Sequence, residues 1–406
     1  MKRVGAGKGK AVAKLSIRDL ELKGKRLLLR VDFNVPLKGG RVTDDTRIVA
    51  SLPTIRLAME EGARVILLSH LGRPKGQRVA EMSLAPVAAR LGELLGRPVP
   101  LAPDCVGEAV KAQVAALGDG DALLLENCRF HDGDEANDEA FARALADLAQ
   151  LYVNDAFGTA HRAHASTVGV TRFLKPAAAG LLMDQELEHL GAALANPKRP
   201  FVAVVGGAKV SDKIAMLQHL LPKVDAVLVG GGMAYTFLKA QGFGVGRSLL
   251  EADRLDVARD VLKAAAGRGL TFLLPLDHVI AEMVDAAAAT RVVDTPNLPD
   301  GWMGLDIGPK TREAFAKILA RAGTIVWNGP MGVFEQPPFR EGTVAVARAI
   351  AASGATSIVG GGDSAAAVAL AGVTDKITHI STGGGASLEF LEGRELPGVV
   401  ALTDRT

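Results

Sequence analysis

The chain has 406 residues, of which 48% are hydrophobic and 23% charged, with a formal net charge of +2. A single core rarely extends beyond roughly 250–300 residues, so the length predicts two domains. The near balance of charge and the 4% aromatic content argue against nucleic-acid and membrane-surface binding. No apolar run approaches the ~20 residues of a membrane span. The two cysteines, Cys105 and Cys128, lack CxxC spacing and fit buried thiols, so we expect a cytoplasmic protein.

The first 14 residues form a basic segment. It contains five lysines and arginines, three glycines and no acid, and it lacks the apolar centre of a secretory signal. We expect this segment to be flexible, and the alternative is a targeting or anion-docking role.

Strand-like and helix-like runs alternate along the remaining chain. In the first half we expect strands at residues 26–31, 65–69, 122–126 and 151–154, and helices at 51–61, 85–95 and 139–150. In the second half we expect strands to begin near Phe201, Ala226, Thr271, Thr324, Ser357 and His379. This alternation is typical of α/β folds, so we predict two doubly wound, Rossmann-like domains with parallel sheets.

A helical pattern at residues 184–196 ends at two prolines, Pro197 and Pro200. Because proline stops a helix, we place the domain boundary there. The predicted division is an N-terminal domain at 1–184, a hinge helix at 185–200, and a C-terminal domain at 201–392.

Polar side chains follow four successive strands of the first half. Asp32 and Asn34 follow the first strand, His70 and Arg73 the second, Arg129 the third and Arg162 the fourth, and Arg47 stands between the first two. Parallel strands end at one edge of a sheet, so these groups are expected to converge. Arginine binds carboxylate and phosphate bidentately, which predicts a pocket for a small phosphorylated acid. Each residue alone also fits a solvated loop.

Two histidines in this region, His161 and His164, have a spacing that could bind zinc. No third histidine or cysteine stands nearby in the sequence, so we do not favour a zinc site. No Gly-x-Ser-x-Gly motif is present, which argues against a hydrolase.

Glycine-rich turns mark the second half. Glycine triplets at 230–232, 360–362 and 383–385 follow strand-like runs, and Gly206 and Gly207 follow another. Such turns expose helix N-terminal N–H groups to anions. We expect Lys209 and Lys213, four residues apart, to share one helix face and reach the terminal phosphates of a nucleotide.

Further residues of the second half suit a magnesium nucleotide. Asp363 could hold Mg²⁺ beside the phosphates, although it could also serve only as a helix N-cap. Residues 327–335 offer polar and apolar walls for ribose and base. Neither a GxxxxGK[ST] loop nor a GxGxxG fingerprint is present, which disfavours a P-loop NTPase and a dinucleotide dehydrogenase.

An acid site in one half and a nucleotide site in the other predict phosphoryl transfer across a cleft. Such transfer depends on positioning and charge neutralisation. A carboxylate acceptor is already ionised at neutral pH, so no general base is required. Two separate half-sites also require hinge closure, which excludes water.

Long motifs in this order resemble the phosphoglycerate kinase family. They are RVDFNVP (30–36), SHLGRP (69–74), ENCRF (126–130), NDAFGTAHRAH (154–164), GGAKVSDKI (206–214), GGGMAYTFL (230–238), GWMGLDIGP (301–309), WNGPMGVFE (327–335), GGGDS (360–364) and STGGGASLE (381–389). The resemblance covers the chain from about Leu15 onward. It implies reversible transfer between ATP and 3-phosphoglycerate, giving ADP and 1,3-bisphosphoglycerate, with Mg²⁺ bound through the nucleotide phosphates.

The resemblance also assigns site residues. The residues implied to bind phosphoglycerate are Asp32, Phe33, Asn34, Arg47, His70, Leu71, Gly72, Arg73, Arg129 and Arg162. Those implied to bind nucleotide are Gly207, Ala208, Lys213, Gly231, Gly232, Gly304, Asn328, Pro330, Glu335, Gly361, Gly362, Asp363 and Ser364, with Asp363 nearest the metal. Those implied to act on the transferring phosphoryl group are Arg47, Lys209, Lys213 and Gly384.

The family pattern further implies a monomer whose residues 393–406 pack back on the N-terminal domain. Two alternatives remain open: another kinase that phosphorylates a small carboxylic acid, and a catalytically silent nucleotide-binding relative.

Overall fold

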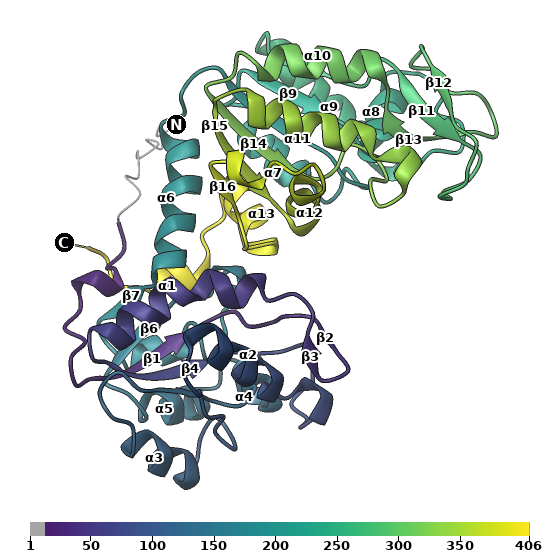
Figure 1. Cartoon of the computed structure of the whole chain (residues 1–406). Helices are drawn as coiled ribbons and strands as arrows, with labels where there is room; N and C mark the ends of the chain where they lie inside the picture. The colour runs from purple at the N-terminus through teal and green to yellow at the C-terminus, as the bar shows by residue number, and fades with distance from the viewer. Residues whose placement is uncertain (1–12, 406) are drawn as a thin grey trace. The chain divides into compact units, whose positions relative to one another are not determined.

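The computed structural model describes residues 13–405, and these divide into two compact units (Figure 1). The first unit contains the described residues up to Glu188 together with those from Glu395 onward, and the second is His189–Arg394. The division falls inside one helix, α6 (Leu181–Ala195). Of the predicted flexible segment 1–14, residues 1–12 lie outside the described chain. Ala13 accepts a hydrogen bond from the N–H of Arg405, and Lys14 forms an ion pair with Asp404.

A five-stranded parallel sheet forms the centre of the first unit, in the order β5-β4-β1-β6-β7. Its strands are β1 (Arg26–Arg30), β4 (Arg64–Leu68), β5 (Ala122–Leu124), β6 (Leu151–Asn154) and β7 (Ala177–Ala179). Each reads as a short apolar run because a parallel sheet is covered by helices on both faces. The covering helices are α1 (Thr46–Glu60), α2 (Ala85–Leu95), α3 (Glu108–Ala115), α4 (Asp132–Glu135) and α5 (Glu139–Ala146). A short hairpin, β2 (Leu37–Lys38) and β3 (Arg41–Val42), stands apart from the sheet.

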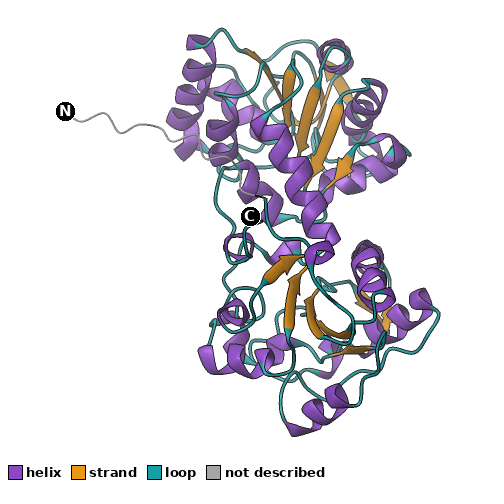
Figure 2. Ribbon diagram, turned by 90° about the vertical axis from the view of Figure 1, so that its left-hand side faces the viewer, coloured by secondary structure: helices purple, strands orange, loops and turns teal. Residues whose placement is uncertain are grey.

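A six-stranded parallel sheet forms the centre of the second unit, in the order β10-β9-β8-β14-β15-β16. Its strands are β8 (Phe201–Val205), β9 (Ala226–Val229), β10 (Thr271–Leu273), β14 (Thr324–Asn328), β15 (Thr356–Gly360) and β16 (His379–Ile380). Its helices are α7 (Ile214–Leu220), α8 (Met233–Ala240), α9 (Leu255–Gly267), α10 (Pro309–Leu319), α11 (Glu341–Ala352), α12 (Gly362–Leu370) and α13 (Gly385–Leu391). The strands lie between helices on either side (Figure 2). The predicted α/β class, with a parallel sheet in each half, is confirmed.

The sequence did not reveal a separate antiparallel sheet in the second unit. It has the order β12-β11-β13 and consists of β11 (His278–Ala281), β12 (Arg291–Val293) and β13 (Met303–Ile307). A small apolar cluster that includes Val279, Leu305 and Phe339 supports it. This sheet carries Gly304 and so places that residue for the site described below.

Helix α1 starts five residues before the predicted position. In the structure Pro53 lies inside the helix, which begins at Thr46 after Asp45. Thr46 donates through both its N–H and its hydroxyl to Asp44, and this local bonding sets the earlier start. Arg47 is consequently a helical residue of the first turn.

The last described residues return to the first unit. In helix α14 (Pro397–Val400), the N–H of Gly398 donates to the carbonyl of Ala160 at 2.8 Å. Thr403 donates its N–H to Ala177 of β7 at 2.9 Å and accepts one from Leu15 at 2.8 Å. Thr403 thereby links Ala177, at the edge of the first sheet, to Leu15. None of the described helices is long and apolar enough to cross a membrane.

Candidate functional site

The loops that follow β1, β4 and β5 are joined by side-chain hydrogen bonds at the carboxyl edge of the first sheet. Asn34 accepts the N–H of Gly72 at 2.9 Å, and Arg129 donates from Nη1 to the carbonyl of Gly72 at 2.9 Å. Asn127 accepts the N–H of Leu71 at 3.2 Å. Gly72 has a φ of +63°, a backbone conformation that favours glycine. The turn carrying Leu71, Gly72 and Arg73 is therefore fixed from both neighbouring strands.

Arg47 and Asp32 form an ion pair at this edge. Nη1 of Arg47 lies 2.9 Å from Oδ2 of Asp32, which is largely buried, whereas Arg47 is partly exposed. Phe33, the next residue, is fully buried, and its N–H donates to Ser69 at 2.9 Å. Asp32 orients the guanidinium and leaves its remaining N–H groups for an anion.

His70 is buried beside a buried arginine that the sequence reading missed. Its Nδ1 lies 3.1 Å from Nη2 of Arg30, which is the last residue of β1 and also donates to Ser166 at 3.1 Å. Burial, followed by the charge of Arg30, holds the pKa of His70 well below its ordinary value. His70 is therefore a neutral hydrogen-bonding group at pH 7. A charged residue ending the apolar run RLLLR was the available signal for Arg30.

The other predicted basic residues differ in exposure. Arg129 is only 4% exposed, Arg162 is partly buried with its Nε 3.2 Å from Nε2 of His161, and Arg73 is exposed. Within residues 13–405, the group of side chains close enough to hold a metal ion contains neither His161 nor His164. The structure thus joins Asn34, Gly72 and Arg129 in one network, and Arg47 with Asp32 in an ion pair.

In the second unit, the prediction that Lys209 and Lys213 share a helix face is wrong. Helix α7 begins at Ile214, so Lys213 is its N-cap and Lys209 lies exposed in the preceding loop. The loop stays non-helical because Ser211 is held by Glu251, through its N–H at 3.0 Å and its hydroxyl at 2.6 Å.

Lys213 instead binds Asn328 at the end of β14. Its Nζ donates to Oδ1 of Asn328, whose Nδ2 donates to the carbonyl of Gly360 at 3.0 Å. Burial lowers the pKa of Lys213, while Asp212, Asp363 and Glu392 act in the opposite direction. The ends of β14 and β15 are joined again by Ser364, which accepts the N–H of Gly329 at 2.7 Å.

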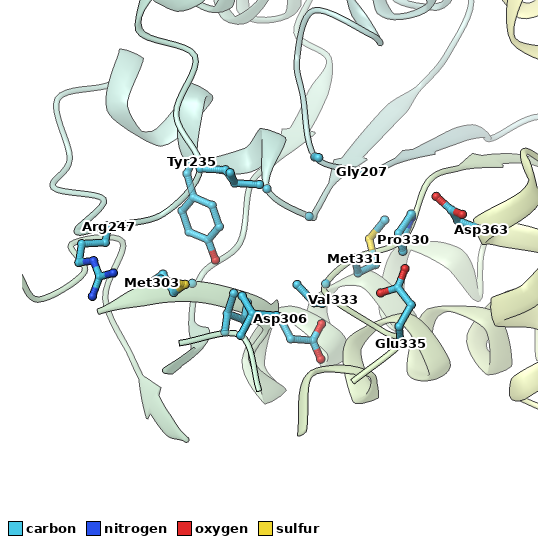
Figure 3. A pocket seen from close by; sticks show the side chains of 18 residues that line it. Gly207, Tyr235, Arg247, Met303, Asp306, Pro330, Met331, Val333, Glu335 and Asp363 are labelled. Atoms are coloured by element: carbon cyan, nitrogen blue, oxygen red, sulfur yellow. The ribbon is translucent and has the colours of Figure 1, made fainter. Parts of the chain in front are cut away.

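A cavity of about 420 Å³ opens beside these residues (Figure 3). It is bordered by predicted nucleotide-binding residues and by others that sequence reasoning did not select. The predicted ones are Gly207, Ala208, Gly231, Gly232, Gly304, Pro330, Glu335 and Asp363. The additional ones include Tyr235, Arg247, Leu249, Met303 and Asp306. Glu335 and Asp363 lie toward one side of the cavity and Arg247 toward the other (Figure 3).

Close backbone packing shapes this cavity. A Cβ atom added at Gly231, which has a φ of +70°, would lie 2.6 Å from the backbone N and O of Gly207. A Cβ at Gly304 would lie 1.8 Å from the hydroxyl of Tyr235, and that hydroxyl is 3.2 Å from Nδ1 of His278. Burial lowers the pKa of His278 to about 4. Only glycine fits at either position without a shift of the neighbouring groups.

Asp306 is a buried carboxyl at the cavity wall. It accepts the N–H of Gly342 at 2.6 Å and that of Ile307 at 2.9 Å. Burial raises its pKa to about 7, even though these hydrogen bonds favour the ionised form. No motif marked it, because a lone aspartate inside a strand has no distinctive spacing.

Asp363 is not the N-cap of α12, which was the alternative to a metal-binding role for this residue. Gly361, with a φ of +92°, is the N-cap, and Asp363 is the second helical residue, exposed at the cavity. Gly362 begins the helix. Gly384 occupies the N-cap position of α13, with a φ of +51°. An exposed carboxylate at a helix N-terminus can hold a cation without sacrificing a structural bond.

A sequence profile described as phosphoglycerate kinase matches residues 17–394. The chain belongs to the phosphoglycerate kinase family. It is accordingly a phosphotransferase of glycolysis. It is 61% identical to the phosphoglycerate kinase of Moorella thermoacetica over 394 residues, covering 97% of this chain and 100% of that protein. It is 57% identical to that of Chloroherpeton thalassium, covering 96% and 99%.

Solved structures of the same family match the fold of this chain. The phosphoglycerate kinase of Coxiella burnetii matches with a TM-score of 0.88 and 47% identity, over 96% of this chain and 98% of that one. That of Pyrococcus horikoshii matches with a TM-score of 0.83 and 35% identity, over 96% and 98%. The chain therefore shares its two-domain α/β architecture with both of these proteins.

Proposed function

We propose that the chain catalyses reversible phosphoryl transfer between ATP and the carboxylate of 3-phosphoglycerate, giving ADP and 1,3-bisphosphoglycerate. The observation that carries this proposal is the glycine-walled cavity of about 420 Å³ that Asp363 borders, with Lys213 bonded to Asn328 at the end of the adjacent strand. Its size and close backbone approach suit a nucleotide.

The first unit would hold the acid. Arg47, aligned by Asp32, and Arg129, fixed by the carbonyl of Gly72, supply guanidinium groups to its carboxylate and phosphate. His70, neutral at pH 7, adds a hydrogen bond without a charge. The remaining residues assigned to the acid are Phe33, Asn34, Leu71, Gly72, Arg73 and Arg162.

The second unit would hold the nucleotide. Gly304, Pro330 and Glu335 would contact the nucleoside, and the backbone of Gly207, Ala208, Gly231 and Gly232 would approach it closely. Asn328 and residues 361–364 would contact the phosphates. Lys213 would neutralise the charge of the transferring phosphoryl group, together with Lys209 and the N–H groups near Gly384.

Mg²⁺ fits this site through the nucleotide phosphates. The group that would hold it is the exposed carboxylate of Asp363, an oxygen donor of the kind that Mg²⁺ prefers. When bound, Mg²⁺ neutralises phosphate charge.

The reaction needs no general base, because the acceptor carboxylate is already ionised at pH 7. The residues of the chain act by binding, orientation and charge stabilisation. The acid and the nucleotide must meet for in-line transfer, so we propose that the two units close on each other during turnover by a hinge at residues 185–200. Closure would also exclude water. We further propose that the enzyme works as a cytoplasmic monomer in which residues 393–406 belong to the N-terminal domain.

The test is a coupled assay of the purified chain with ATP, Mg²⁺ and 3-phosphoglycerate. Arg47→Ala is expected to abolish turnover with an unchanged circular dichroism spectrum, because the partly exposed guanidinium, paired with Asp32, would neutralise the carboxylate of the acid. Arg56→Ala is the matched control, since Arg56 lies exposed on the same helix. Turnover only on a different carboxylic acid would refute the substrate assignment, and full activity of Arg47→Ala would remove Arg47 from the mechanism.

A further inference from the structure

Three side chains of the first unit that the proposed function does not use lie together. They are Asp104, Cys105 and His131, and their ligand atoms all lie within 4.8 Å of one another. Asp104 and Cys105 stand in the loop before α3, whereas His131 immediately precedes α4. A carboxylate oxygen, a sulfur and an imidazole nitrogen together form a donor set that suits zinc-like ions.

The imidazole is already oriented toward the other two groups. Its Nε2 lies 2.6 Å from Oδ1 of Asp104, and its ring stacks on Phe141 with centroids 4.8 Å apart and planes at 25°. Ordinary zinc bond lengths place the donor atoms of a tetrahedral site roughly 3.3–3.6 Å apart. The cluster therefore needs side-chain shifts of only about 1 Å to surround an ion.

Burial closes the cluster on the protein side and leaves it open to solvent. Cys105 is 0% exposed, and its thiol donates to the carbonyl of Glu126 at 2.7 Å. The side chains of His131 and Asp104 are 30% and 36% exposed. An ion can thus reach the cluster from solvent through the exposed carboxylate and imidazole, with the buried sulfur beneath them.

The positively charged guanidinium of Arg78 already lies near the cluster. Nη1 of Arg78 lies 3.7 Å from Oδ2 of Asp104, and its side chain is 57% exposed. The same guanidinium donates to the carbonyl of Pro103 and lies over the ring of Phe130, and these contacts keep it beside Asp104. It competes with a metal ion for the same carboxylate and so lowers the affinity of the site.

We propose that Asp104, Cys105 and His131 form a binding site for a thiophilic divalent cation of the Zn²⁺ type, with water in the fourth position. On binding, the Cys105 S–H bond breaks, its proton goes to solvent, and the sulfur binds the ion as a thiolate. The hydrogen bonds from Cys105 to Glu126 and between His131 and Asp104 are replaced by bonds to the metal.

The test uses the full chain, freed of metal with a chelator and titrated with Co²⁺ alone. We expect one ion per chain, a thiolate charge-transfer band in the near ultraviolet, and the intense visible bands of tetrahedral cobalt. Added Zn²⁺ should bleach these bands. Cys105→Ser should abolish the charge-transfer band, His131→Gln should weaken binding at least about tenfold, and Arg78→Gln should strengthen it.

Cys128→Ser is the matched control, because Cys128 is the other buried thiol and donates instead to Asp134 at 3.2 Å. It should keep the charge-transfer band. His131→Gln provides a second readout if Cys105→Ser fails to fold, since His131 is partly exposed. The proposal is overturned if cobalt stays in its octahedral hydrated form, if Cys105→Ser keeps the band, or if His131→Gln binds as tightly as the original chain.

Discussion

Asp155 should make the stability of the first unit depend on pH through its contact with α6. Its Oδ1 accepts the N–H groups of Leu182 and Met183 at 2.9 and 3.1 Å, so it caps the start of that helix. Oδ2 has no hydrogen-bond partner among the described residues. Burial raises the pKa of this carboxyl to about 6, against the hydrogen bonds from Thr54 and the two helix N–H groups.

The sign of the effect follows from proton binding. Between pH 4 and pH 6 the folded chain holds a proton on Asp155 that the unfolded chain has released, so stability falls as pH rises. A pKa raised from 3.8 to about 6 changes the free energy of unfolding by about 3 kcal/mol. This contribution is present at pH 4 and below and is fully lost above pH 6. Asp155→Asn keeps the capping oxygen and removes the charge, although its buried amide N–H₂ costs about 1–2 kcal/mol.

We therefore expect Asp155→Asn to stabilise the first unit by about 1–2 kcal/mol at pH 8 and not at pH 4. Asp155→Ala, which removes both charge and cap, should gain less at pH 8 and lose about 1 kcal/mol at pH 4. The assay is urea denaturation followed by far-ultraviolet circular dichroism at pH 4, 5, 6, 7 and 8. An Asn effect that is the same at every pH, or destabilisation at pH 8, would refute the reasoning.

Two further predictions concern the second unit. Gly304→Ala places a Cβ 1.8 Å from the Tyr235 hydroxyl, so the KM for ATP should rise at least about tenfold while the KM for the acid stays unchanged. Gly267→Ala is the comparison in steady-state kinetics, because Gly267 is an exposed residue of α9 with no atom within 4 Å of the added Cβ. An unaltered KM for ATP in Gly304→Ala would place the nucleoside elsewhere. Lys213→Met should lower kcat about 10²–10³-fold, with a smaller change in nucleotide affinity measured by calorimetry. Lys239→Met, a substitution of an exposed lysine on α8, should leave both unchanged, and a loss of affinity with an unchanged kcat in Lys213→Met would mean that Lys213 only binds nucleotide.

The sequence predicted the elements that depend on local pattern. Strand β6 has the predicted bounds, and β8 and β9 begin at the predicted residues, because each is a contiguous apolar run between turn residues. Strand β7 was missed because its three residues are alanines, which carry no strand preference. They are held in the sheet by residues distant in sequence, in β6 and at Leu15 and Thr403.

The site residues could likewise be predicted only where a local sequence pattern marked them. Asp32, Asn34, His70 and Arg129 could be selected because they follow strands, and the structure places them at one sheet edge; their roles remain predictions. Tyr235 could not be selected, since it lies inside α8 and borders the cavity only because β13 lies opposite it. The helical placement of Lys209 failed because Glu251, 40 residues beyond Ser211, holds the loop. Contacts between distant residues leave no local pattern.

The return of residues 395–405 to the first sheet affects how the chain can fold during synthesis. Thr403 supplies the partner for the N–H and carbonyl groups at the edge near Ala177 and Leu15, yet more than 200 residues separate Ala177 from Thr403 along the chain. Ala179 of β7 is already paired with Leu15 at that stage, but while the ribosome is still producing the second unit, the N–H and carbonyl of Ala177 and the N–H of Leu15 lack their partner and are open to other strands. The unit made first is therefore finished last, and nascent chains that stop at residue 394 are expected to be the aggregation-prone ones.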